Sequence, residues 1–144
     1  MKRIEVSLNL AVVAPLLDFI KPILEMLSAE TVLTADLGEE DHELQELWHD
    51  GLIQDQVTDC EHLMQLFDAE FFESGRIALT SENAEFVLRA ASAIRLKLRE
   101  TAMEGITDAD LEVGDIEPES LTETERLGFA SYLFLATLQE IIIK

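Results

Sequence analysis

Basic residues are scarce in this sequence. Ten Lys and Arg stand against thirty Asp and Glu, so the formal net charge is −20 over 144 residues. No basic residue lies between Lys21 and Arg76, a stretch that holds 15 acidic residues, and none lies between Arg99 and Arg126. A surface this negative repels nucleic-acid phosphates and anionic lipid headgroups. We therefore expect neither nucleic acid nor a membrane as partner, whereas basic proteins and cations are compatible with the charge.

Cysteine occurs once, so no disulfide can form within the chain, and a reducing compartment is the simpler expectation. Cys60 lies between Asp59 and Glu61 on an apolar helical stripe, where burial and negative charge both disfavour a reactive thiolate. Long uncharged apolar runs are lacking as well. Glu5 and Asn9 interrupt the apolar N-terminus, and no uncharged stretch approaches the length of a membrane span. We expect a cytoplasmic protein without a signal peptide.

Apolar residues, in contrast, make up 48% of the chain, and 144 residues form one domain by size. Nine residues are aromatic, so the core is expected to consist mostly of Leu, Ile, Val and Ala. Apolar side chains recur at helical spacing in several segments. The pattern predicts a single, mainly α domain over residues 1–144, a bundle of about five helices at roughly 15–27, 39–50, 55–72, 80–103 and from 122 onward.

The first residues follow a different period. Residues 4–10 alternate between apolar and polar side chains, which is the period of a half-buried strand. Residues 76–79 are a second short candidate strand. If Ser74 and Gly75 form a turn, this segment pairs with the N-terminal strand. On that condition the sequence adds a small two-stranded antiparallel element to the helical bundle.

Three residues are predicted to interrupt or end helices. Pro22 lacks the N–H that would bind the Asp18 carbonyl, which predicts a kink or a restarted helix at that point. Gly51 is predicted to end the helix at 39–50. Gly105 is predicted to end the helix that begins at residue 80.

The last two helices are predicted to pack on each other. Residues 80–103 combine one apolar stripe with four of the ten basic residues. The final helix begins with a capping box, in which the side chains of Thr122 and Glu125 each accept the other residue's backbone N–H. Its run from 127 to 138 carries no charge, which predicts a central helix. Its small residues are expected to approach the alanines at positions 90, 91 and 93.

These two helices also carry a recognisable set of residues. They include Ala93-Ile94-Arg95-Leu96-Lys97-Leu98 in the penultimate helix, the acidic loop that follows it, and Leu138-Gln139-Glu140 in the final helix. Over roughly residues 80 to 144, the C-terminal half resembles an uncharacterised bacterial domain-of-unknown-function family that is best represented in actinobacteria. The resemblance implies a mostly helical fold and no particular activity.

Metal binding is one candidate chemistry. Each of the three His residues has an acidic residue three positions before it, a spacing that places both side chains on one helical face. Leu44, Leu47 and Trp48 are predicted to point inward, which turns the His-bearing face outward, so we favour a solvated surface over an interior metal centre. The alternative is a metal-dependent enzyme or metal-binding protein that uses Glu39, His42, Glu46 and His49.

Charge segregation is a second candidate feature. The acidic stretch from Glu25 to Glu73 keeps good helical patterning without a compensating base. Such a face fits the docking of a basic protein, and plain solubility is the simpler explanation. The partner-binding candidates are Glu39, Glu43 and Glu46.

Arg95 is a third candidate, because it interrupts an otherwise apolar turn. A buried Arg is normally paired. We expect a structural ion pair with Glu140, or with an acid of the second helix, and anion or partner binding is the alternative. Together these features favour a non-enzymatic acidic interaction or regulatory protein that uses no cofactor.

Overall fold

The computed structural model describes residues 3–29, 42–114 and 116–143, with the side chains at 28, 29, 42–50, 52, 53, 113 and 118 outside the description. Within these ranges the fold is mainly helical with one two-stranded antiparallel sheet, as the sequence predicts. The elements are β1 (Ile4–Ser7), α1 (Leu10–Ala29), α2 (His42–Gln65), α3 (Ala69–Ser74), β2 (Arg76–Leu79), α4 (Ala84–Glu100), α5 (Asp108–Val113), the 3₁₀ turn η1 (Pro118–Ser120) and α6 (Glu123–Ile143).

The predicted pairing of the two short strands is confirmed. β1 and β2 are antiparallel, with Ile4 opposite Leu79 and Ser7 opposite Arg76. Gly75 precedes β2 with a φ of 74°, and its carbonyl accepts the N–H of Leu8 at 2.7 Å. A Cβ at this position would lie 2.8 Å from the Leu8 carbonyl oxygen. Both the left-handed backbone and the close approach therefore require glycine here.

Helix α1 begins five residues earlier than predicted, at Leu10. The side chain of Asn9 accepts the N–H of Ala11 at 3.0 Å, and its carbonyl accepts the N–H of Val13 at 2.9 Å. This cap ends the strand pattern before residue 10 and starts the helix. Helix α1 continues as one helix through both of its prolines, so it does not restart at Pro22, and the alternative expectation of a kink there stays a prediction.

Helix α2 replaces two predicted helices. It continues through Gly51, so this glycine does not end a helix as expected. A glycine inside a helix costs only about 1 kcal/mol relative to alanine, which tertiary packing can offset. The chain instead breaks after Gln65, where the carboxylate of Asp68 caps α3 by accepting the N–H of Phe71 at 3.0 Å.

Helices α4 and α6 both begin with reciprocal caps. Before α4, the N–H of Thr80 donates to Asn83 Oδ1 at 2.9 Å, and the N–H of Asn83 donates to Thr80 Oγ1 at 3.3 Å. Before α6, the predicted capping box is confirmed, with N–H to side-chain distances of 2.9 and 3.1 Å between Thr122 and Glu125. Helix α4 ends at Glu100, before the predicted stop at Gly105.

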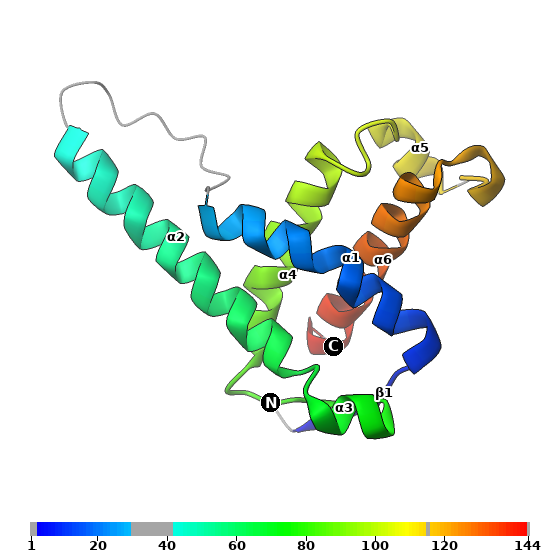
Figure 1. Ribbon diagram of the computed structural model, residues 1–144, viewed down its shortest axis with the longest axis horizontal. Coiled ribbons are helices and arrows are strands. Elements are labelled where there is room, and N and C mark those ends of the chain that lie inside the picture. The colour runs from blue at the N-terminus through cyan, green and yellow to red at the C-terminus, as the bar shows by residue number, and fades with distance from the viewer. Residues whose placement is uncertain (1–2, 30–41, 115, 144) are drawn as a thin grey trace.

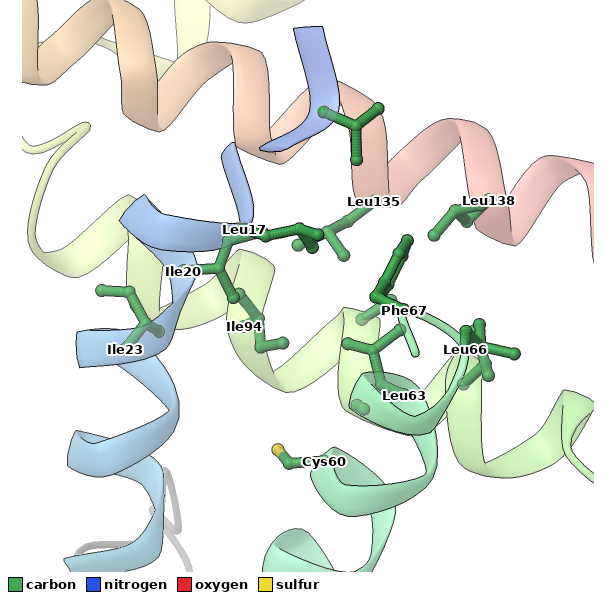
Figure 2. Close-up of a cluster of buried hydrophobic side chains, with 14 of the residues drawn as sticks. Leu17, Ile20, Ile23, Cys60, Leu63, Leu66, Phe67, Ile94, Leu135 and Leu138 are labelled. Carbon is green, nitrogen blue, oxygen red and sulfur yellow. The ribbon is translucent and has the colours of Figure 1, made fainter. Parts of the chain in front are cut away.

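The core lies where α1, α2, α4 and α6 meet. Figure 1 shows α1 crossing α4 and α6, and α2 also packs against α1 and α4. Figure 2 shows side chains from all four helices pointing toward one another. Those that are at most 3% exposed include Leu17 and Ile20 of α1, Leu63 of α2, Ile94 of α4, and Leu135 and Leu138 of α6.

Helix α6 is less enclosed than its uncharged run predicts, since Leu133 is 47% exposed. Its small residue Gly128 approaches the end of α4 rather than the alanines at 90–93. A Cβ on Gly128 would lie 2.7 Å from the Ala102 side chain. By length and composition alone α6 could cross a membrane, and 28% of its apolar window is buried inside the fold. Core helices meet the same criterion, so this property does not assign a location.

Candidate functional site

The acidic and metal candidates from the sequence lie mostly beyond the described side chains. Glu39 falls outside the described residues. His42, Glu43, Glu46 and His49 belong to α2, but the description does not cover their side chains. Among the described residues, no three His, Cys, Asp or Glu side chains come close enough together to hold a metal ion. The metal and partner assignments at these positions therefore stay predictions.

The third histidine, His62, lies at a polar hollow. Its ring stacks on Phe86, with 3.8 Å between ring centroids and 19° between the ring planes. The hollow has a volume of about 320 Å³ and lies beside the sheet. Charged residues of both signs line it: Arg3, Glu5, Asp68, Glu70 and Arg76. Its three acidic and two basic side chains nearly balance, so it offers little net attraction to a ligand of one sign.

Cys60 is buried, as predicted, at 7% exposure. Burial, and next the carboxylate of neighbouring Asp59, raise the pKa of the Cys60 thiol to about 11. A thiol of this pKa is almost entirely protonated at neutral pH and is a poor nucleophile. The structure thus supports a packing role for Cys60.

Asp59 is a buried carboxylate that sequence reasoning assigned to no role. It is 6% exposed, and it accepts hydrogen bonds from Arg89 Nε at 3.2 Å and from Arg89 Nη2 at 3.1 Å. The hydrogen bond to this carboxylate raises the pKa of Arg89, so the guanidinium stays charged. This pair joins α2 to α4 at the edge of a hollow of about 500 Å³, which also exposes Asp55, Phe86 and Leu96.

Arg95 lies on the other side of α4 and contacts α6. Its Nη1 donates to Gln139 Oε1, and its Nη2 donates to the hydroxyl of Tyr132 at 3.0 Å. The guanidinium carbon also lies over the Tyr132 ring, 4.4 Å from its centre. Gln139 in turn donates from Nε2 to Ser92 Oγ at 2.8 Å and to the Leu88 carbonyl at 2.9 Å. Arg95 is therefore fixed by neutral groups.

The predicted ion pair between Arg95 and Glu140 needs correction. Among the described residues no ion pair joins these two side chains, and Glu140 is exposed. Successive residues on a helix point about 100° apart, so Gln139 faces α4 while its neighbour does not. Gln139 is 8% exposed and takes the place of the expected carboxylate.

A hollow of about 310 Å³ opens beside this network, between α4 and α6. We call it the α4–α6 hollow, and its lining residues are Ser92, Arg95, Leu96, Arg99 and Tyr132. Arg99 is held by the carbonyls of Met103 and Ile106 at 3.0 and 2.8 Å, and by Asp108 at 2.7 Å. Among the described residues, this hollow therefore has two guanidinium groups in its wall and no acidic side chain.

Comparison with models of known protein families identifies the family of this chain. The model of a family described as "Domain of unknown function (DUF2017)" matches residues 23–144. The chain belongs to this family. Searches of curated proteins and of solved structures returned no match. The match to DUF2017 includes α2 to α6 in full. It therefore extends well beyond residues 80–144, the part of the sequence that shows the family resemblance.

Two polar residues of this DUF2017 domain, Asp59 and Gln139, have positions that the sequence could have indicated. Asp59 precedes buried Leu63 by four positions, and Gln139 follows buried Leu135 by four, so both lie on apolar stripes. A polar residue on such a stripe usually has a hydrogen-bonding partner. Ser92 gives no comparable signal, because an exposed serine on a helix is common.

Proposed function

We propose that this member of the DUF2017 family is a non-enzymatic, cytoplasmic interaction protein whose partner is a basic protein. The distribution of its charge supports the proposal. Every acidic side chain whose burial is described is exposed, except buried Asp59 and half-buried Glu125. Several basic side chains are already engaged with acids, among them Arg89 with Asp59 and Arg99 with Asp108. The outward field is therefore strongly negative, and such a field steers basic proteins toward the surface.

The sequence locates the docking face within the acidic stretch that includes Glu39, Glu43 and Glu46. The test is affinity capture from native lysate with the wild type and with the triple variant Glu39→Gln, Glu43→Gln, Glu46→Gln. A matched control neutralises Glu112, Glu117 and Glu119, which are exposed around α5 and η1. Both variants change the net charge equally, so the comparison separates a docking face from total charge.

We expect the wild type and the control to capture one discrete basic protein that the first triple variant loses. The association rate should fall steeply with salt, because the Debye length shrinks from about 10 Å at 0.1 M to about 3 Å at 1 M. Dissociation should change less. Capture that is indifferent both to salt and to the first triple variant would show that the charge serves solubility alone.

A further inference from the structure

Hydrogen-bond donors outnumber acceptors among the side chains that line the α4–α6 hollow. An arginine has five N–H groups and no acceptor. Arg95 uses one N–H on Gln139 and one on Tyr132, and its buried Nε has no partner among the described residues. The Tyr132 hydroxyl accepts from Arg95, and Ser92 Oγ accepts from Gln139, so each hydroxyl keeps its own proton to donate.

The charge of the hollow matches these donors. No acidic residue in the described part of the chain lines it, although the whole sequence has three times as many acidic as basic residues. The hollow beside the sheet contains Glu5, and the one between α2 and α4 contains Asp55. Arg95 has no carboxylate partner in the described part of the chain, and Asp108, which pairs with Arg99, is 92% exposed and is not among the lining residues. The guanidinium of Arg95 is therefore a positive charge without a described counter-charge, and an anion would supply it.

We propose that the α4–α6 hollow binds a carboxylate. A guanidinium matches a carboxylate in shape and charge. A net charge of −20 repels every added negative charge, so a singly charged carboxylate enters at lower cost than a doubly charged phosphate. Leu96, which is 54% exposed, and the Tyr132 ring supply an apolar wall for the carbon chain that bears the carboxylate. This site is separate from the acidic docking face and does not depend on it.

The carboxylate can come from a small free acid or from a side chain of a bound protein, and the probes separate these sources. The first probe is isovalerate, a branched monocarboxylate, with isovaleramide as its uncharged counterpart. Binding is followed by NMR at constant ionic strength through the amide signals of residues 92–96 and the Arg95 Nε–H signal. We expect saturable shifts with isovalerate. The affinity for isovaleramide should be at least about tenfold weaker, because the neutral amide has no negative charge to pair with the guanidinium. The affinity for inorganic phosphate should also be at least about tenfold weaker, because the net negative charge of the protein repels the doubly charged anion.

Two protein variants test the location. Leu96→Glu places a negative charge at the rim of the hollow and should weaken isovalerate binding at least about tenfold. Val12→Glu is the matched control, since Val12 is 58% exposed on α1 and the net charge changes equally. It should alter the affinity by less than about twofold, because Val12 does not line the hollow and an exposed charge is screened by salt. Both residues are exposed, so both variants should fold.

Three results would overturn the proposal: equal binding of isovaleramide, tighter binding of phosphate, or equal weakening by Leu96→Glu and Val12→Glu.

A final pair of probes identifies the source of the carboxylate. A hexapeptide with glutamate between leucines is compared with the same peptide carrying glutamine. A higher affinity for the glutamate peptide than for isovalerate supports a side chain of a partner protein as the source. Binding of isovalerate without binding of the glutamate peptide supports a small acid. Neither outcome depends on whether a basic partner is captured.

Discussion

At the scale of single residues, two arginines of α4 are held in contrasting ways. Arg89 meets the buried carboxylate of Asp59, so its charge is balanced within the fold. Arg95 meets the amide of Gln139 and the hydroxyl of Tyr132, so its hydrogen bonds are partly satisfied, while no described carboxylate balances its charge. The pair of Arg89 and Asp59 links α2 to α4. The contacts of Arg95 leave its positive charge at the hollow between α4 and α6.

The contributions of Arg95 and Gln139 to stability should be coupled through the hydrogen bond between them. Arg95→Met leaves Gln139 Oε1 without its donor, and Gln139→Met leaves the guanidinium without its acceptor, each at a cost of about 1–3 kcal/mol. The double variant removes both polar groups. It should therefore be less destabilised than the two single losses combined, with a coupling of about 0.5–3 kcal/mol in urea unfolding. Additive losses would mean that the bond contributes nothing to stability.

The Cys60 thiol should make stability depend on alkaline pH. Its pKa is about 11 in the folded protein and 9.0 ordinarily, so the unfolded chain loses the proton first. Stability is therefore complete below pH 9.0 and falls as the pH rises toward about 11. Urea unfolding of the wild type and of Cys60→Ala under reducing conditions checks this. The difference between them should change only above pH 9.0, and a constant difference would contradict the burial argument.

At the scale of elements, two helical glycines have opposite surroundings. A Cβ on Gly51 of α2 would meet nothing within 4 Å. A Cβ on Gly128 of α6 would lie 2.7 Å from the Ala102 side chain and 3.4 Å from Met103. One glycine is thus a weak point inside a helix, and the other allows α6 to approach the segment after α4.

Alanine at these two positions should change stability in opposite directions. Gly51→Ala should raise the free energy of unfolding by about 0.5–1 kcal/mol, because alanine restricts the unfolded chain and favours helix. Gly128→Ala should lower it, because overpacking of about 1–3 kcal/mol outweighs the same gain in helix propensity. Thermal or urea unfolding decides between them. Stabilisation by Gly128→Ala would show that α6 can shift away from Ala102 without loss.

At the scale of the whole molecule, the sequence predicted the parts whose signals are local. The capping box of Thr122 and Glu125, the two short strands and the four long helical stretches follow from spacing over a few residues. The interruption predicted at Gly51 and the restart predicted at Pro22 are absent, because tertiary packing overrides the unfavourable helix propensity of glycine and proline.

The polar contacts between helices could not be predicted in the same way. Whether Arg95 meets Gln139 or Glu140 depends on the rotation of α6 about its axis, and a single residue step changes it by about 100°. The α4–α6 hollow depends on that same rotation and on the packing of Tyr132. Sequence spacing identifies an arginine that needs a partner, but the partner is set by the assembled fold.

The pairing of β1 with β2 also sets an order of events. The first strand leaves the ribosome about 70 residues before its partner, and closing a loop of that length has a substantial entropic cost. Two four-residue strands are too short to be stable alone. We therefore expect the sheet to form late, after α1 has packed on α4 and α6 and has brought residues 4–7 to their partner. Until then, Ile4 and Val6 form an unpaired apolar segment, so β1 should be among the last elements to reach its native place.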